Sequence, residues 1–209
     1  MLTPARAAAG GFALMLALVA VRLVSAREPD LPPAPPDDLP HYTARGELRM
    51  PSDYRGWVWL STGLGMSYRA RTAGNAAMGP NFDNVFVSRR AYDAFRRTGH
   101  WPQKTVFVLE VRGSKNHGSI EHGGRFQSQL MGLEAEVKDA AQFPEGTRFF
   151  AFDGPNGTPI PQTACLSCHR ANGALEDTFA QFYPTVFDLA DRKGTLNRHY
   201  LARLKPPSP

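Results

Sequence analysis

The sequence contains little cysteine: Cys165 and Cys168 are the only two in 209 residues. A chain of this size buries about 70% of the surface that it exposes when unfolded, so its core does not need disulfide bonds. The two cysteines are therefore available for chemistry.

The chain also lacks a large excess of charge of either sign. The formal charge of +5 decreases by two without residues 1–26, and the other Lys and Arg residues are scattered among Asp and Glu. This weak balance predicts no nucleic-acid partner. One dense basic cluster comprises Arg89, Arg90, Arg96 and Arg97. It is either a solvated helix face or a docking patch for an acidic redox partner protein.

A long apolar run occurs at residues 7–21, between Arg6 and Arg22. A basic residue, an apolar run and small residues up to Ala26 are typical of a secretory signal peptide. An uncleaved anchor is the alternative, but a spanning helix needs about 20 apolar residues, and Arg22 ends this run. We expect residues 1–26 to be cleaved, leaving a periplasmic protein without stable membrane insertion.

The rest of the chain divides into a leader, one domain and a tail. Residues 27–40 are rich in Pro and Asp and predict a stiff, solvated leader. Residues 41–200 are predicted to form one domain without internal repeats. Residues 201–209, which end in Pro-Pro-Ser-Pro, predict a flexible tail.

Short segments rich in Val, Phe or Trp, separated by Gly and Asn, are typical of strands. These segments are residues 57–61, 84–87, 105–112, 127–138 and 148–152. The connections at 113–124 and 153–162 resemble turns rather than crossover helices, which favours an antiparallel sheet.

The sequence predicts few helices. One would begin after Ser88 as N-cap and end at Gly99, between the second and third strands. Two short helices are predicted after Thr163, separated by Pro184, and packed on the sheet. The predicted class is therefore α+β, a single domain dominated by an antiparallel sheet.

The sequence Cys165-Leu166-Ser167-Cys168-His169 has the spacing that attaches c-type haem. Two thiols three residues apart lie on one face of a helical turn and can form thioether bonds to the haem vinyl groups. The adjacent His169 would then give Nε2 to the iron as proximal ligand. A disulfide is an alternative that leaves His169 unexplained, and a zinc site would need further, distant ligands.

The sixth position on the iron has no obvious ligand. No methionine follows His169, and His199, the one downstream histidine, lies in a polar stretch. Beyond the predicted signal peptide, the methionines that precede the motif are Met50, Met66, Met78 and Met131, and packing as flexible hydrophobes is the simpler role for each. The sequence therefore favours one covalent haem c with five-coordinate iron and an open face for a small molecule.

Several separated strings have a characteristic order and spacing. They are Tyr54-Arg55-Gly56-Trp57, Asn84-Val85-Phe86-Val87, Ala91-Tyr92 with Arg97-Thr98-Gly99, Thr105-Val106-Phe107-Val108, the segment 132–139, the haem motif, and Phe182-Tyr183-Pro184. Over residues 48–190 they resemble the cytochrome P-460 family, which includes the cytochromes c′-β. The resemblance implies an antiparallel β-rich fold, often in a homodimer, with a five-coordinate haem.

Two functional branches are implied by this resemblance. In one, a strand lysine is bonded to the haem edge and the protein oxidises hydroxylamine. In the other, that bond is absent, and an apolar distal pocket binds nitric oxide or carbon monoxide.

The cross-linking position falls on Leu109, which has no nucleophile. The resemblance therefore favours the branch without the cross-link, unless Lys104 or Lys115 substitutes. Lys104 would lie on the opposite strand face from Leu109 because side chains alternate with period two.

The resemblance also places Glu134 near the distal face, where it would relay protons from a bound substrate. From the residues alone an exposed strand carboxylate is the alternative, since Glu136 shares its parity. Phe107 shares a face with Leu109, and together with Phe82 they would form an apolar wall over the iron. A core role for these aromatic residues is compatible with that wall.

Three functions follow from these features. The first is a protein that binds a diatomic gas such as nitric oxide or carbon monoxide at haem iron. The second is an oxidoreductase acting on hydroxylamine or another small nitrogen compound, with Glu134 as proton acceptor. The third, simple electron transfer, is weakened by the missing downstream methionine.

We expect the haem to remain with the polypeptide during acid–acetone extraction, because two thioether bonds would hold it. The absorption spectrum of the reduced protein should lack the signature of a lysine cross-link. Loss of haem into the acetone would contradict the proposed attachment.

Overall fold

The computed structural model describes residues 38–66, 79–118, 120 and 122–204. The predicted signal peptide and residues 27–37 of the predicted leader lie outside the described residues, as does Met78. Within the described part of the chain, no helix is both long and apolar enough to cross a membrane.

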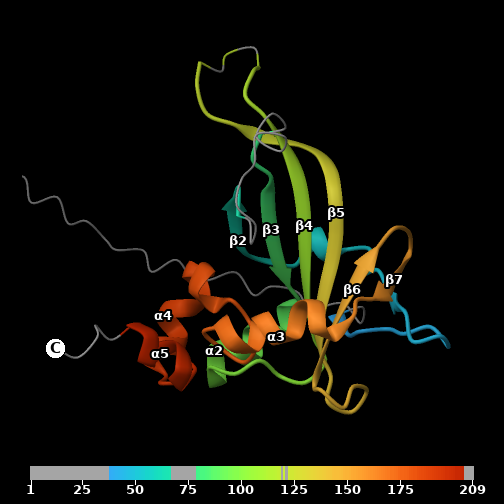
Figure 1. The fold of residues 1–209 in the computed structure, drawn as a ribbon, viewed down its shortest axis with the longest axis vertical. Helices are drawn as coiled ribbons and strands as arrows, with labels where there is room; N and C mark the ends of the chain where they lie inside the picture. Colours follow the sequence, from blue (N-terminus) through green and yellow to red (C-terminus); the bar gives the residue numbers. More distant parts are fainter. Residues whose placement is uncertain (1–37, 67–78, 119, 121, 205–209) are drawn as a thin grey trace, which may run out of the picture. The chain divides into compact units, whose positions relative to one another are not determined.

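Seven strands form one antiparallel sheet in the order β1-β7-β6-β5-β4-β3-β2 (Figure 1). They are β1 (Leu48–Arg49), β2 (Val58–Leu64), β3 (Phe82–Val87), β4 (Thr105–Lys115), β5 (Phe126–Lys138), β6 (Thr147–Phe152) and β7 (Asn156–Pro159). Every strand pair is antiparallel. The predicted α+β class with a dominant antiparallel sheet is confirmed.

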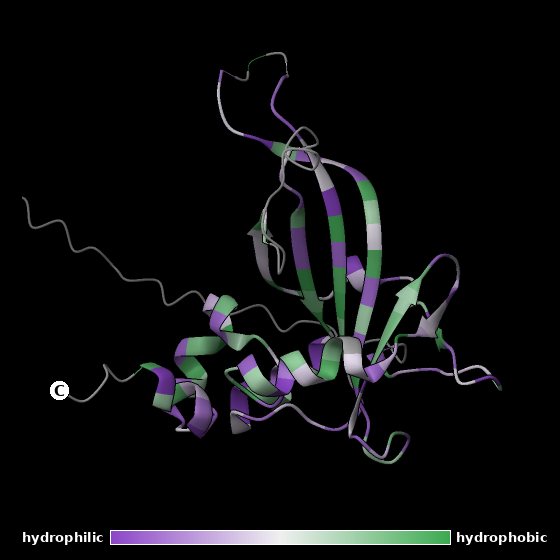
Figure 2. Cartoon of the chain, in the orientation of Figure 1, coloured by the Kyte–Doolittle hydropathy of each residue, from purple (hydrophilic) through white to green (hydrophobic). Residues whose placement is uncertain are grey.

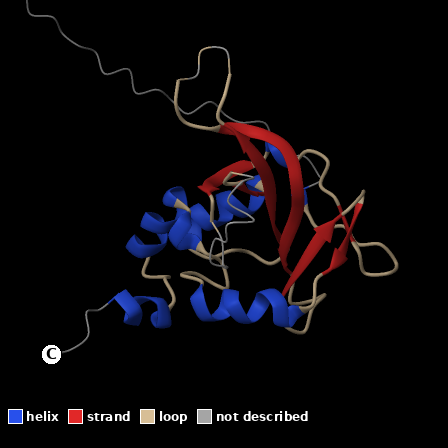
Figure 3. Ribbon diagram, turned by 45° about the horizontal axis from the view of Figure 1, so that its top comes forward, coloured by secondary structure: helices blue, strands red, loops and turns tan. Residues whose placement is uncertain are grey.

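The helices lie beside the sheet rather than between its strands (Figure 3). They are α2 (Arg89–Thr98), α3 (Gln162–Asn172), α4 (Pro184–Arg192) and α5 (Arg198–Leu204), with short 3-10 turns η2 (Tyr54–Gly56) and η3 (Ala180–Phe182). Helix α5 extends four residues into the predicted tail. Helical segments lie before and after the η3–α4 boundary at Pro184. Pro184 is itself the first residue of α4, because proline lacks only an N–H that a first turn leaves unpaired.

Helix α2 has the predicted bounds but a different cap. Ser88 occupies the N-cap position without a side-chain capping bond. The Asp38 carboxylate instead accepts a hydrogen bond from the backbone N–H of Arg90 at 2.8 Å. Gly99 ends the helix with φ of +79°, a conformation that favours glycine.

Strands β1 and β7 were not predicted. Strand β7 lies within the segment predicted as a turn, and it pairs with both β6 and β1. Its Asn, Gly and Pro residues are unfavourable in strands. Its strand conformation therefore depends on pairing with its neighbours.

The central strands separate two apolar clusters. Figure 2 shows apolar and polar stretches along them. On β4 the four consecutive residues 106–109 are apolar, so this strand contributes apolar side chains to both faces, because successive side chains point to opposite faces. On the helix side, Phe107 packs with Val87, Phe95 and Trp101. On the other side, Val106 and Val108 pack with residues from β5 and β6.

A buried carboxylate joins η2 to the sheet. Glu110 is 3% exposed and accepts hydrogen bonds from the hydroxyl of Tyr54, from Arg55 Nε at 2.8 Å and from Arg112 Nε at 2.5 Å. Burial alone would raise the pKa of Glu110, but the bonds from Arg112, Tyr54 and Arg55 outweigh it and lower that pKa. The charged carboxylate is therefore the form that stabilises the fold.

We expect Glu110→Gln to lower the free energy of unfolding at pH 7 by about 1–3 kcal/mol, because it leaves buried donors without their charged acceptor. The pKa of Glu110 is lower when folded, so its contribution is present above the ordinary carboxyl pKa of about 4.3 and is lost as the pH falls. Urea unfolding should therefore show a smaller difference from wild type at pH 4 than at pH 7.

The matched control is Glu145→Gln. Glu145 is half-exposed and contacts Arg148 at 3.4 Å, so its removal should change the stability by less than about 0.5 kcal/mol. Equal losses in the two variants would contradict a special role for Glu110.

Candidate functional site

Helix α3 carries the two cysteines and the histidine of the motif. Cys165 and Cys168 lie one turn apart, are partly buried and form no disulfide. Burial raises the pKa of the Cys165 thiol, and the nearby Glu134, Cys168 and Glu136 raise it further. Both thiols are therefore accessible for bonding, and the surroundings of Cys165 disfavour its thiolate.

His169 has one ring nitrogen engaged and the other available. Its Nδ1 donates to the backbone carbonyl of Asp177 at 2.8 Å, and a carbonyl can only accept, which fixes the tautomer. The imidazole lies between the rings of Phe149 and Phe179, with centroid distances of 4.6 Å and 4.4 Å. This arrangement leaves Nε2 with its lone pair free to bind a metal.

The Asp177 carbonyl is presented by a strained turn over residues 175–178. Glu176 and Asp177 have φ of +45° and +65°, left-handed values that are unfavourable for residues other than glycine. The backbone N–H of Thr178 donates to the carbonyl of Leu175 at 2.7 Å and closes the turn.

Contacts from three other segments hold this turn. Lys138 on β5 donates to the backbone carbonyl of Glu176. The Glu176 carboxylate accepts from the backbone N–H of Trp101 at 3.0 Å and contacts His100 Nδ1 at 2.6 Å. The side chain of Asn197 accepts from the backbone N–H of Glu176 at 3.3 Å. These contacts offset the strain and fix the acceptor for His169.

A second carboxylate approaches the same imidazole. Glu136 Oε2 lies 3.5 Å from His169 Nδ1, and Glu136 is 9% exposed. Burial opposes the charged form of His169, but Glu136 and Asp177 outweigh it and raise its pKa. Glu134 and Glu136 are two positions apart on one strand, so the sequence predicted the same face and similar exposure for both. In the structure Glu136 is buried and Glu134 is exposed.

Three residues on neighbouring strands are paired on the face of the sheet that carries Glu136. Leu109 pairs with Val85 on one side and with Glu134 on the other. The surrounding protein raises the pKa of Glu134, although its side chain is open to solvent, and His169 opposes that shift. The predicted residues Leu109 and Glu134 therefore lie side by side.

Asp83 is a further acidic residue on this face, and the sequence analysis did not identify it. Its strand partner is Val111, one alternation beyond Leu109. Burial raises the pKa of Asp83, and the charge of Glu134 raises it further. No sequence signal distinguished Asp83, because its proximity to Glu134 depends on the register of three strands.

The predicted apolar wall of three residues is wrong for Phe82. Phe82 pairs with Arg112, so alternation places it on the opposite face from Leu109. Phe107 shares the face of Leu109, but it is 4% exposed and packs edge-on against Trp101 at 4.9 Å. It is a core residue.

Neither candidate lysine lies beside Leu109. Lys104 precedes β4 in a left-handed conformation, and Lys115 is the last residue of that strand. At about 3.3 Å per strand residue, Lys115 is roughly 20 Å along the strand from Leu109.

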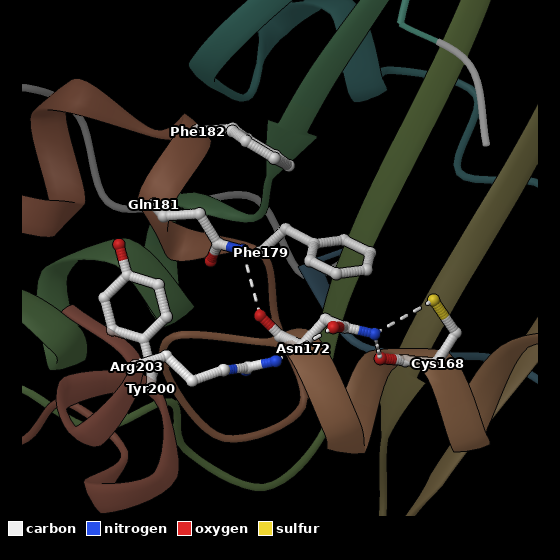
Figure 4. Close-up of a pocket in the computed structure, with 7 residues that line it drawn as sticks. All are labelled: Cys168, Asn172, Phe179, Gln181, Phe182, Tyr200 and Arg203. Carbon is white, nitrogen blue, oxygen red and sulfur yellow. Dashed lines mark hydrogen bonds between the residues drawn. The ribbon is translucent and has the colours of Figure 1, made fainter. Parts of the chain in front are cut away.

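An open pocket of about 440 Å³ lies beside Cys168 (Figure 4). Its lining comprises Cys168, Asn172, Phe179, Gln181, Phe182, Tyr200 and Arg203. Asn172 Nδ2 donates to Cys168 Sγ at 3.5 Å, and Arg203 holds Asn172 Oδ1 at 3.0 Å. Phe179 and Phe182 contribute apolar surface to this lining.

These residues fit a covalently held haem. Two free thiols lie on one helical turn, the next residue presents a free Nε2, and aromatic rings flank the imidazole. Among the residues that the structure describes, no group of three or more His, Cys, Asp or Glu side chains converges as a zinc site would require.

Comparison with known families matches most of the folded region. The family model described as Cytochrome P460 matches residues 51–180, more than half of the chain. The match includes strands β2 to β7 and the motif on α3. No curated protein matches the chain.

The end of α3 has no room for a side chain at Gly173. A Cβ there would lie 2.7 Å from the carbonyl oxygen of His169 and 2.9 Å from that of Thr178. We expect Gly173→Ala to destabilise the protein by about 1–3 kcal/mol in urea unfolding and to reduce haem loading. Gly154→Ala is the control, because nothing lies within 4 Å of its added Cβ. Equal effects would contradict the crowding at Gly173.

Proposed function

The chain belongs to the cytochrome P460 family, and we propose that it is an exported cytochrome whose single haem c binds a small ligand such as nitric oxide or carbon monoxide. Family membership implies the haem. The attachment, the ligand and the export to the periplasm are the proposed parts, together with assembly as a homodimer.

In this proposal the motif on α3 holds the haem. Cys165 and Cys168 form the thioether bonds, and His169 Nε2 binds the iron, since Nδ1 is occupied by the Asp177 carbonyl. The bound haem supplies an iron that can take a ligand at its sixth position. Phe149 and Phe179 contact the imidazole on two sides and limit its rotation.

The described methionines are poorly placed as sixth ligands. Met50 packs against the apolar cluster on the sheet face opposite to Phe107. Met66 and Met131 are 45% and 44% exposed, and His199 is exposed on α5. These positions support an open sixth site.

The proposal rests mainly on the position and apolar character of Leu109. It lies between Val85 and Glu134 on the face that carries Glu136, and it replaces the cross-linking lysine of the other branch. An apolar side chain there favours an uncharged diatomic ligand over an anion, because burying an unpaired charge costs several kcal/mol.

We expect the purified ferrous protein to show a five-coordinate spectrum and to bind one carbon monoxide per haem. His169→Ala should retain haem through both cysteines but lose that spectrum, because the proximal nitrogen is removed. A wild-type spectrum with both axial positions filled, or no change on adding carbon monoxide or nitric oxide, would contradict the proposal.

An oxidoreductase acting on hydroxylamine or a related nitrogen compound is the second candidate. Asp83 and Glu134 favour it, because both have raised pKa values and share the face of Leu109. A carboxylate with a raised pKa is a better proton acceptor near neutral pH. Glu134, the more exposed of the two, would take the proton from the substrate.

For this second function we expect turnover with an artificial electron acceptor to rise with pH through the pKa of Glu134, since the acceptor must be ionised. Glu134→Gln should lower turnover by about 10²–10⁴-fold and remove that pH limb. Glu145→Gln is the control, because this carboxylate lies in the turn before β6 and should leave the rate unchanged. Absence of turnover in the wild-type protein would exclude the oxidoreductase.

A further inference from the structure

Glu136 is a buried carboxylate with an incomplete set of partners. It is 9% exposed, and its Oε1 is buried without a hydrogen bond among the described residues. In the same part of the chain its one ion-pair contact is His169 Nδ1, 3.5 Å from Oε2. A buried carboxylate normally requires a charged or hydrogen-bonded partner, because its desolvation costs several kcal/mol.

Glu136 lies between two aromatic residues on the neighbouring strands. Its cross-strand neighbours are Phe107 on β4 and Phe149 on β6. Phe149 also contacts the ring of His169. Electrostatic interactions between Glu136 and His169 are therefore weakly screened.

The imidazole has one proton on Nδ1 and two acceptors for it. The Asp177 carbonyl, at 2.8 Å, holds the proton in this structure, and Glu136 lies at the outer limit of a hydrogen bond. A cation bound at Nε2 withdraws electron density from the ring and makes Nδ1–H a stronger donor. The charged acceptor then gains more than the neutral carbonyl, because charge-assisted hydrogen bonds are roughly twice as strong.

We propose that Glu136 is a positioning residue that acts on the iron through His169 as an anionic second acceptor for Nδ1–H. The inference rests on the proposed ligation by His169. A carboxylate behind a metal-binding histidine increases the basicity of the ligating nitrogen. Glu136 therefore strengthens the bond from Nε2 to iron and favours the ferric state, which lowers the reduction potential.

The test compares Glu136→Gln and Glu136→Leu with the wild-type holoprotein. The readouts are the iron–histidine stretching frequency of the ferrous protein, from resonance Raman spectroscopy, and the midpoint potential. We expect the frequency to decrease and the potential to rise from wild type to Gln to Leu, as the acceptor becomes neutral and is then lost. Gln keeps the shape of Glu, so it decides the outcome if the Leu variant fails to fold.

Glu134→Gln is the matched control. It removes the same charge from the same strand and face, but no contact joins Glu134 to Nδ1 among the described residues. The loss of charge can change the midpoint potential of this variant by a long-range electrostatic effect. Its iron–histidine stretching frequency should equal that of wild type.

Three negative results are possible, and they do not all have the same meaning. A wild-type protein without haem, or without an iron–histidine band in the ferrous state, would contradict the proposed function. A wild-type band that is unchanged in both Glu136 variants would overturn the role of Glu136 and leave the Asp177 carbonyl as the acceptor. A frequency change in Glu134→Gln as large as in Glu136→Gln would also overturn it, since charge alone would then explain the effect.

Discussion

The hydrogen bond from His169 Nδ1 to the Asp177 carbonyl is the interaction on which the site depends. It selects the tautomer that leaves Nε2 free, and it is possible only because Glu176 and Asp177 adopt left-handed backbone conformations. Lys138 and the Glu176 carboxylate connect this turn to β5 and to Trp101 in the helix-side core. A single imidazole orientation is thus fixed by contacts spread over the domain.

The antiparallel register gives the two faces of the sheet different chemistry. On one face, the Glu110 carboxylate accepts hydrogen bonds from Tyr54, Arg55 and Arg112, so its charge stabilises the fold. On the other face, Glu134 and Glu136 make few contacts and lie toward α3. Glu136, which has a buried acceptor atom without a hydrogen bond among the described residues, and the exposed Glu134 therefore lie on the face of the sheet beside the motif on α3.

Leu109 and its neighbours combine two properties that separate the family's functional branches. The leucine cannot form a bond to a porphyrin, and it presents an apolar surface. Glu134, its strand partner, and Asp83 supply acidic groups with raised pKa values on the same face. The proposed gas binding rests on the apolar leucine, and the alternative proposal, proton-coupled chemistry on a nitrogen compound, rests on the two acidic groups.

The sequence by itself determined the α+β class, the antiparallel sheet and the shared face of Phe107 and Leu109, whereas haem attachment at residues 165–169 stays a prediction from the motif. These depend on spacing along one strand or one helical turn, where the periods of 2 and 3.6 are reliable. Only the tertiary structure placed Phe82 on the other face, buried Glu136 while exposing Glu134, and brought Asp83 near Glu134. It also provided the Asp177 carbonyl, which no side-chain pattern reveals. Register between strands and left-handed backbone are set by contacts distant in sequence, and for that reason local pattern could not predict them.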